Sequence, residues 1–282
     1  MASRDFGEVT ERLRRSTVQV HSGRRGSGSG VLWSEDGLIV TNAHVARAER
    51  ARVELWDGRE FDVPVATRDT RRDIASLKID AQGLPAVSAG DSSELRPGQV
   101  VLAVGNPLGF VGALTTGVVH ALGPLRGIGR QNWVQAAIRL APGNSGGPLA
   151  DAQGRVVGLN TMVVAGGLAL AVPSNTVAEF LRRGVSTARL GVTVRPVLLE
   201  DRHSLALLVL EVEPRGAAAE ASMLIGDLLL GANGRGFESV EDLSDAIEAA
   251  AGSTLVLEFR RGDRERKREV TVRLGTRSAE AA

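Results

Sequence analysis

The sequence predicts a mainly β protein with two domains, and three observations support this. Its 282 residues are enough for two domains that each bury a core. It contains 34 glycines and many short apolar runs. Turn-forming pairs separate these runs at Asp36-Gly37, Asp57-Gly58 and Gln153-Gly154. This pattern favours β-barrels over a helical bundle, because barrels consist of short strands joined by tight turns.

Helical periodicity occurs in two segments that flank the predicted strands, at residues 5–15 and 175–183. Between them, from residue 17 to about residue 170, the sequence alternates between short apolar runs and turns, which predicts strands. The apolar residues that share one face are Phe6, Val9 and Leu13 in the first helix, and Val177, Phe180 and Leu181 in the second.

Charge and composition exclude several classes of protein. The net charge of +1 argues against a nucleic-acid partner, and the basic run at 260–268 is interpreted as a solvated hairpin, with a polyanion site as the alternative. With no cysteine, the chain has neither a disulfide framework nor thiol chemistry. We expect no metal and no cofactor. The first residues lack the apolar region of an export signal and no segment could span a membrane, so we expect a cytoplasmic protein, or a periplasmic or exported one if this is a mature form.

The most informative stretch of the chain is residues 143–148, Gly-Asn-Ser-Gly-Gly-Pro. Glycines around Ser145 free the backbone, leave room for a substrate and allow amides to turn inward. An exposed hydroxyl beside backbone N–H groups that can hold an oxyanion is what acyl transfer requires. By itself the string is also compatible with a glycine-rich turn before a strand.

Two further residues complete a catalytic pattern with Ser145. His44 follows the apolar run Leu-Ile-Val at 38–40, where a strand ends, and Asp73 opens the run Ile-Ala-Ser-Leu-Lys-Ile, interpreted as a strand with one buried face. A serine nucleophile needs a base, and the base needs an orienting acid. The order His, Asp, Ser is that of chymotrypsin-type barrels and differs from that of α/β-hydrolases. Asp69 and Asp80 are rival acids, but neither is followed by an Ile-Ala pair.

These motifs resemble the Deg/HtrA family of serine proteases from about residue 8 to about residue 275. The resemblance implies a lead-in segment at 1–16, a trypsin-like protease domain at 17–184 and a PDZ domain at 189–275. The protease domain is expected to be a chymotrypsin-like pair of six-stranded barrels, with His44 and Asp73 from the first and Ser145 from the second. The other stretches that carry the resemblance are 26–31 (Gly-Ser-Gly-Ser-Gly-Val), 105–109 (Gly-Asn-Pro-Leu-Gly) and 171–175 (Ala-Val-Pro-Ser-Asn).

The resemblance also implies a role for each member of the pattern. Ser145 is the nucleophile, His44 the general base and then the acid, and Asp73 the residue that holds the histidine tautomer. The oxyanion hole is expected in the segment Gly143, Asn144 and Ser145, with the amides of Gly143 and Ser145 as donors. Trypsin-like zymogens carry an aspartate where this chain has Asn144, so we expect no activation by a new N-terminus. Control is expected through loop ordering instead.

The substrate pocket shows a departure from the family pattern. The family commonly has Gln-Thr-Asp-Ala before the active-site loop, and here Ala137 replaces the aspartate. Arg139 lies six positions before Ser145, where related enzymes place the base of the S1 pocket. Arg139 either selects an acidic P1 residue or turns to solvent or a loop carboxylate. The expected pocket wall is apolar and favours aliphatic P1 residues; it comprises Thr161, Met162, Val163, Leu168 and Leu170.

The PDZ-like segment is expected to bind hydrophobic C-terminal peptides. Leu190, Gly191 and Val192 match the family loop whose amides receive a peptide carboxylate, and the next strand would pair with the peptide. Ser239 is interpreted as the start of a capping box that opens a helix. Leu243 and Ile247 on that helix are expected at the groove, although most of its apolar face must be core.

We therefore expect an ATP-independent serine endopeptidase of protein quality control that acts on unfolded or damaged proteins. No P-loop string is present. The resemblance implies a homotrimer, for which Phe6 and Phe110 are the candidate aromatic contacts. The main alternative is a peptide-binding or chaperone module with a resting or silent protease domain. An esterase is the weaker alternative, because the glycine pattern favours peptide hydrolysis.

Overall fold

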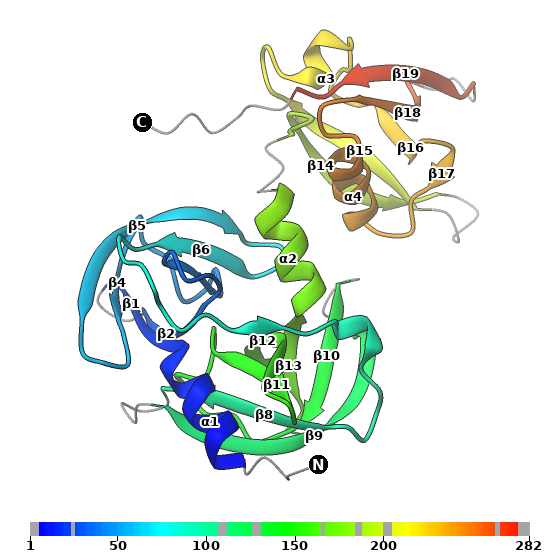
Figure 1. Ribbon diagram of the computed structural model, residues 1–282. Helices are drawn as coiled ribbons and strands as arrows, with labels where there is room; N and C mark the ends of the chain where they lie inside the picture. The colour runs from blue at the N-terminus through cyan, green and yellow to red at the C-terminus, as the bar shows by residue number, and fades with distance from the viewer. Residues whose placement is uncertain are drawn as a thin grey trace. The chain divides into compact units, whose positions relative to one another are not determined.

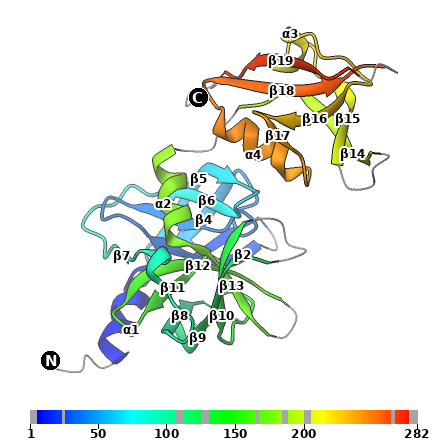
Figure 2. The ribbon, with the colours of Figure 1, turned by 90° about the vertical axis from the view of Figure 1, so that its right-hand side faces the viewer.

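The computed structural model describes residues 6–23, 26–106, 112–125, 131–164, 167–183, 188–199, 205–262 and 266–275. The chain divides into two compact units, Met1–Val185 and Ser186–Ala282 (Figures 1 and 2). Most of the predicted linker at 184–188 lies outside the described residues, as do Phe110 and part of the basic run at 260–268. Each unit consists mainly of strands, which confirms the predicted fold class.

The first unit begins with a closed six-stranded barrel. All its strands are antiparallel to their neighbours, and a glycine with positive φ stands in two of its hairpin turns, at Gly37 and Gly58. The strands, in barrel order, are β1 (Thr17–Ser22), β2 (Gly26–Leu32), β3 (Leu38–Thr41), β6 (Ile74–Lys78), β5 (Glu60–Asp69) and β4 (Arg50–Glu54).

A second six-stranded barrel follows in the same unit, closed by the pairing of its first and last strands (Figure 1). Its strands, in barrel order, are β8 (Val100–Gly105), β9 (Ala113–Pro124), β10 (Asn132–Ala137), β13 (Ala169–Pro173), β12 (Arg155–Val163) and β11 (Pro148–Asp151). A short strand β7 (Ser88–Ala89) pairs in parallel with β12, and the 3₁₀ turn η1 (Ser92–Glu94) follows it.

A shared apolar cluster joins the two barrels and the helix α2 (Ser174–Arg183). Ile74 from the first barrel packs in this cluster with Trp133 from the second and Phe180 from α2. The helix predicted near residues 175–183 is therefore confirmed, with its apolar face buried. The interpretation of β6 as a strand with one buried face was wrong, because four consecutive residues from Ile74 are buried. One face of β6 fills the first barrel and the other packs on this cluster.

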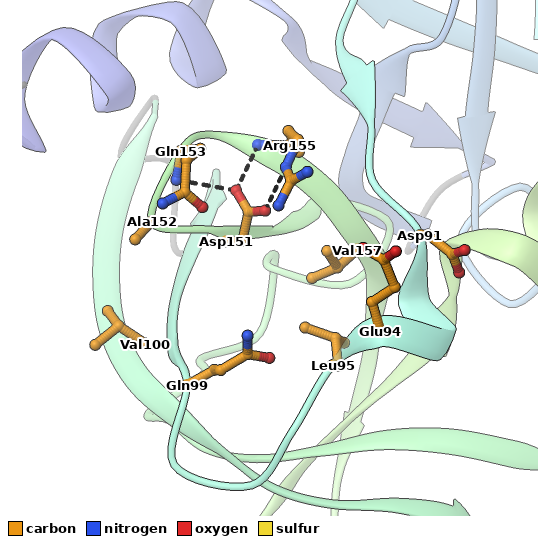
Figure 3. A pocket seen from close by; sticks show the side chains of 10 residues that line it. All are labelled: Asp91, Glu94, Leu95, Gln99, Val100, Asp151, Ala152, Gln153, Arg155 and Val157. Carbon is orange, nitrogen blue, oxygen red and sulfur yellow. Dashed lines mark hydrogen bonds and ion pairs between the residues drawn. The ribbon is translucent and has the colours of Figure 1, made fainter.

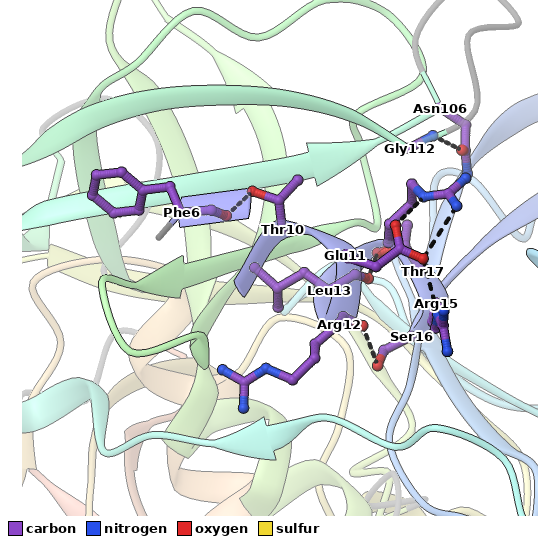
Figure 4. Close-up of polar contacts among 11 residues, drawn as sticks. Phe6, Thr10, Glu11, Arg12, Leu13, Arg15, Ser16, Thr17, Asn106 and Gly112 are labelled. Atoms are coloured by element: carbon purple, nitrogen blue, oxygen red, sulfur yellow. Dashed lines mark hydrogen bonds and ion pairs between the residues drawn. The ribbon is translucent and has the colours of Figure 1, made fainter. Parts of the chain in front are cut away.

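The helix α1 (Phe6–Arg15) confirms the predicted helix near residues 5–15. Val9 and Leu13 are buried against outward-facing residues of β8, whereas Phe6 is exposed. Glu11 accepts hydrogen bonds from Arg14 and Arg15, and these lower its pKa to about 2. After the end of the helix, the Ser16 hydroxyl donates to the Arg12 carbonyl and the Thr17 hydroxyl donates to the Leu13 carbonyl (Figure 4). These bonds satisfy carbonyls in the last turn that have no partner within the helix.

The second unit is a sheet of six strands with two helices. Its strands run in the order β14 (Val192–Leu198), β15 (Leu205–Val212), β16 (Leu228–Ala232), β18 (Thr254–Arg260) and β19 (Arg268–Arg273), with β17 (Arg235–Gly236) paired to β16. The helices are α3 (Ala217–Glu220) and α4 (Glu241–Ala249). The core of this unit includes Leu207, Leu229, Leu243 and Leu257. Because β14 is an edge strand of the sheet, a further strand can be added beside it.

The predicted capping box before α4 is half formed, because Asp242 accepts the Ser239 amide but the Ser239 hydroxyl caps no amide. Val240 is the N-cap residue, and no side chain caps the helix there. The hydroxyl of Ser239 is buried without a hydrogen-bond partner among the described residues. Instead, Asp242 reaches back and accepts the amides of Glu238 and Ser239, at 2.6 Å and 2.9 Å. The Asp242 carboxylate, in the first turn of the helix, thus accepts the two amides that precede it, and the Ser239 hydroxyl caps no backbone amide.

Candidate active site

His44 and Asp73 come together because their strands are neighbours. β3 ends at Thr41 and β6 begins at Ile74, and Thr41 pairs with Ala75, so the residues after β3 and before β6 meet at one barrel end. His44 Nδ1 lies 2.7 Å from Asp73 Oδ2, and the His44 amide donates to Asp73 Oδ1 at 3.0 Å. Two contacts from one carboxylate hold both the ring and the backbone of the histidine.

The backbone of Asp73 is held in an unusual conformation. Its φ is +56°, in the left-handed region that non-glycine residues rarely adopt. The Asn42 amide group donates to the Asp73 carbonyl at 2.9 Å, and the Thr161 hydroxyl donates to Asp73 Oδ2. These contacts over-determine the carboxylate, which is also partly shielded from solvent. The rival Asp69 binds the amides of residues 71 and 72 instead.

Ser145 lies on the loop between β10 and β11, which belongs to the second barrel. Its hydroxyl donates to the Thr161 carbonyl at 2.8 Å. Within the described residues, no hydrogen bond joins this hydroxyl to His44. Delivery of the serine proton to the histidine therefore requires the hydroxyl to turn away from Thr161. Such loose nucleophile–base contacts are common in enzymes without bound substrate.

The loop that carries Ser145 leaves two amides available. Among the hydrogen bonds of the described residues, none has the amide of Gly143 or Ser145 as its donor. The amide of Asn144 differs, because it donates to the Ala141 carbonyl at 3.0 Å. Asn144 is buried, and its side-chain amide donates to that same carbonyl. An oxyanion bound at this loop would therefore accept hydrogen bonds from the amides of Gly143 and Ser145. Asn144 would contribute by holding the turn through its two bonds to the Ala141 carbonyl.

Ser29 is a residue near the site whose importance we did not predict from the sequence. It lies in β2, within the Gly-Ser-Gly string at 28–30. Its amide donates to the Ser145 carbonyl at 2.8 Å, and its hydroxyl donates to the Gly143 carbonyl at 2.7 Å. The glycine motif around Ser29 was the available signal, but the partners lie more than 100 residues away in sequence.

The predicted S1 residues differ widely in exposure. Arg139 is exposed, and its side chain makes no hydrogen bond or ion pair within the described part of the chain. Met162 and Val163 are exposed apolar residues at the end of β12, which suits a substrate-facing surface. Thr161 is buried beside Asp73, Leu168 is half-buried, and Leu170 is completely buried. Leu170 therefore belongs to the apolar cluster shared by the two barrels and α2, and it is not available as a pocket wall.

A hollow of about 300 Å³ lies on the second barrel, and it does not include the His44–Asp73 pair (Figure 3). At one side of it, Asp151 accepts the amides of Gln153 and Arg155 and pairs with the Arg155 guanidinium at 2.7 Å. These bonds organise the turn between β11 and β12. The pKa of Asp91, at the other side, is lowered by hydrogen bonds from Ser93 and Asn175. Two carboxylates that line this hollow therefore stabilise local structure: Asp151 holds the β11–β12 turn and Asp91 caps η1.

In the second unit, the predicted carboxylate loop precedes β14. Gly191 has a φ of +75°, and its carbonyl accepts the amide of Glu213 at 2.8 Å. Within the described residues, the amides of Leu190 and Gly191 have no hydrogen-bond acceptor. Leu243 is buried in the core and Ile247 is half-buried beside it. Of these two helix residues, Ile247 is the better candidate for contact with a ligand.

Comparisons with known proteins agree with this architecture. Residues 28–159 match the trypsin-like peptidase domain, and residues 208–261 match the PDZ domain. A protein of Halomonas elongata named "probable periplasmic serine endoprotease DegP-like" is 36% identical over 270 residues, which cover 88% of this chain and 56% of that protein. Serine protease HTRA1 of Xenopus tropicalis is 35% identical over 268 residues, covering 84% of this chain and 58% of the relative. The chain thus spans little more than half the length of these curated relatives.

A solved structure of the HtrA-type protease AlgW with a decapeptide superposes with a TM-score of 0.76 at 25% identity. The superposition covers 98% of this chain and 100% of that one. In the described residues, no helix is both long and apolar enough to cross a membrane. The two matched domains and these relatives place the chain in the family of DegP/HtrA serine proteases, as a trypsin-like peptidase domain followed by a C-terminal PDZ domain.

Proposed function

We propose that this chain is an ATP-independent serine endopeptidase that cleaves unfolded or damaged proteins through an acyl-enzyme. The observation that carries the proposal is the doubly held His44–Asp73 pair, together with a serine loop whose two amides have no protein acceptor among the described residues. A nucleophile, a base with its orienting acid, and free oxyanion donors are the three parts that acyl transfer needs.

The proposed reaction begins when the Ser145 hydroxyl leaves the Thr161 carbonyl and turns to His44. His44 takes the hydroxyl proton as Oγ attacks the peptide carbonyl, and the resulting oxyanion accepts the amides of Gly143 and Ser145. Asp73 stabilises the imidazolium. His44 then protonates the leaving amine, which frees the first product. Water, deprotonated by His44, hydrolyses the acyl-enzyme and restores the serine.

The proposed S1 preference is for small aliphatic side chains. Met162 and Val163 offer an exposed apolar wall, and burial of an aliphatic side chain there is favourable. The exposure of Arg139 supports the alternative in which this residue turns to solvent. We therefore infer that Arg139 does not select acidic P1 residues.

In the PDZ domain, we propose that the amides of Leu190 and Gly191 receive the carboxylate of a hydrophobic C-terminal peptide. The edge strand β14 would pair with the peptide backbone. The decapeptide bound to AlgW gives a precedent for a peptide ligand in a similar chain. We infer that such a ligand regulates the protease by favouring an arrangement in which the Ser145 hydroxyl no longer donates to the Thr161 carbonyl.

Broader proposals rest on the relatives and on the family resemblance. We infer that the protein acts in the periplasm or another exported compartment, because the Halomonas relative is named periplasmic. A role in a stress response is inferred from the family resemblance alone. We also infer a homotrimer, with Phe6 as an exposed aromatic contact near the N-terminus. Cell fractionation tests the compartment, and a monomeric mass in sedimentation at micromolar concentration would contradict the trimer.

The first experiment incubates wild-type protein and Ser145→Ala with casein, an unfolded substrate. We expect cleavage by the wild type alone, with product ends, identified by mass spectrometry, that follow small aliphatic residues. Frequent ends after Asp or Glu would instead assign Arg139 to the pocket. Cleavage by both proteins would exclude Ser145 as the nucleophile.

If neither protein cleaves casein, the second candidate function gains support, which is a peptide-binding or chaperone module with a silent protease domain. The contact of the Ser145 hydroxyl with Thr161 is the observation that favours it. Prevention of casein aggregation by both proteins, without any cleavage, is the result expected from such a module.

A further inference from the structure

Ser29 belongs to the first barrel, yet three of its groups contact the loop of the second barrel that carries Ser145. Its amide and hydroxyl bind the carbonyls of Ser145 and Gly143, at 2.8 Å and 2.7 Å. Its own carbonyl oxygen faces Gly146, where a Cβ atom would lie only 2.0 Å from it. Ser29 is completely buried, so water cannot replace these contacts.

These contacts decide which way the peptide planes of the loop face. The carbonyls of Gly143 and Ser145 both point to Ser29, and the carbonyl of Asn144 accepts the amide of Gly147 at 3.0 Å. The plane between Gly143 and Asn144 is held at both ends, since its N–H donates to Ala141. All three carbonyls are thus occupied, and the amides of Gly143 and Ser145 remain for an oxyanion.

The hydroxyl of Ser29 is itself held in one orientation. It accepts the amide of Asn106 at 2.9 Å, so its single proton is left for the Gly143 carbonyl. Asn106 is buried, and its side chain donates to the Val18 carbonyl at 3.0 Å and accepts the Gly112 amide at 2.9 Å. The Gly143 carbonyl is therefore bound to a fixed donor.

Gly143 needs an external restraint because a glycine backbone in its conformation is easily rotated. Its φ is +105°, a region that glycine enters and leaves at low cost. A glycine at this position allows the preceding peptide to rotate, and that rotation would remove the Gly143 amide from the oxyanion. The hydrogen bond from the Ser29 hydroxyl to the Gly143 carbonyl holds the peptide that follows Gly143, and this limits the rotation of the residue as a whole.

We propose that Ser29 is a positioning residue for the oxyanion hole, which fixes the Gly143–Asn144 peptide between the two donor amides and so restricts the rotation of the Gly143 amide on one side and of the Ser145 amide on the other. The proposal rests on the proposed protease function. Ser29 touches neither the substrate nor the reacting atoms. It acts by keeping a donor in place before the negative charge develops, which is the condition under which such donors accelerate acyl transfer.

The test compares Ser29→Ala with wild-type protein on a peptide substrate. We expect kcat to fall by roughly 10- to 100-fold with KM unchanged, a smaller loss than the 10²- to 10³-fold found when a donor itself is removed. Affinity for a peptide boronic acid, which forms a tetrahedral adduct with Ser145, should fall by the same factor. Affinity for the acyl-side product peptide with an amidated C-terminus, which places no negative charge at the oxyanion hole, should not change.

Ser174→Ala is the matched control. Its hydroxyl is also buried and donates to a backbone carbonyl, that of Gly90, at 2.7 Å, away from the serine loop. The Ser174→Ala variant should be less stable than the wild type, but its affinity for the boronic acid should not fall. If Ser29→Ala does not fold, Ser29→Cys replaces it, because a thiol keeps most of the volume and is a weak donor.

The outcomes separate this inference from the proposed function. Wild-type protein that fails to cleave the peptide or to bind the boronic acid contradicts the protease function itself. Wild-type activity together with unchanged kcat and boronic acid affinity in Ser29→Ala or Ser29→Cys overturns only the positioning role. A drop in affinity for the amidated product peptide equal to that for the boronic acid also overturns it, because general disruption of the cleft would then explain the loss.

Discussion

At the scale of single residues, the candidate site depends on backbone atoms as much as on side chains. His44 is held through its amide as well as its ring, and the Ser145 loop is held through carbonyls. Gly146 in this loop is required because the backbone of Ser29 in β2 and the hydroxyl of Thr41 in β3 approach it closely. It has a φ of +83° and no space for a side chain.

We predict that Gly146→Ala lowers kcat by about 10²-fold or more, the scale of a lost oxyanion donor. The added Cβ would lie 2.0 Å from the Ser29 carbonyl oxygen and 2.3 Å from Thr41 Oγ1, so the loop must move. Peptide hydrolysis by purified variants measures this.

Gly58→Ala is the control for that prediction. Gly58 has nearly the same φ, +84°, but nothing lies within 4 Å of the added Cβ. It should cost about 1 kcal/mol of stability through backbone strain and leave kcat unchanged. Equal kcat values for the two variants would show that the close contacts around Gly146 do not matter.

At the scale of elements, the first unit is joined by a cluster that both barrels and α2 share, and the second unit is joined by a buried ion pair. Asp227, completely buried before β16, accepts Arg261 Nε at 2.6 Å and Nη2 at 2.7 Å, and the Leu224 amide at 2.9 Å. The pairing raises the pKa of Arg261. It ties the turn before β16 to the residue after β18.

We predict that Asp227→Ala destabilises the second unit by about 3 kcal/mol, because it leaves a guanidinium and a buried amide without their acceptor. The expected loss lies at the low end of the free-energy range for broken buried ion pairs, because Arg261 keeps some contact with solvent. Hydrogen exchange of the amides in β16 and β18, followed by mass spectrometry, measures the loss in opening free energy.

Asp62→Ala provides the comparison for an exposed pair. Asp62 lies 3.1 Å from Arg50, and both side chains are more than half exposed. Exchange in β4 and β5 should change by less than about 1 kcal/mol. If the loss at Asp227 is no larger than the loss at Asp62, the assigned role of the buried pair is wrong.

At the scale of the whole molecule, the chain combines a peptidase unit with a unit that presents an edge strand and a loop with free amides. The Ser145 hydroxyl donates to the Thr161 carbonyl, and catalysis requires this bond to break. For the proposed protease of unfolded proteins, such a bond would spare folded proteins until a ligand changes the arrangement. A ligand can activate it only if it binds the active arrangement more tightly than the resting one.

We predict that a peptide with a hydrophobic C-terminus raises casein cleavage by the full chain. The same peptide with an amidated C-terminus should have little effect, because the carboxylate is the group expected at the amides of Leu190 and Gly191. Initial rates of casein cleavage at matched peptide concentrations measure the difference. Equal stimulation by the acid and the amide would contradict recognition of the carboxylate.

Features that depend on neighbouring residues could be predicted from the amino-acid sequence. Helical periodicity identified α1 and α2, because the spacing of Val9 and Leu13, or of Val177 and Phe180, already defines one buried face. Glycine in the turns at Gly37, Gly58 and Gly154 was predictable for the same local reason. The motifs also pointed to His44, Asp73 and Ser145 as a set.

Features that depend on distant partners become visible only in the folded protein. Ser29 and Gly143 are separated by 114 positions, so no local pattern reveals their hydrogen bond. The contact of the Ser145 hydroxyl with Thr161 likewise arises only when β12 lies beside the serine loop within the second barrel, and the burial of both faces of β6 arises only when the two barrels pack. Local spacing sets the backbone path of one element, whereas hydrogen-bond partners and burial depend on which elements the fold brings together.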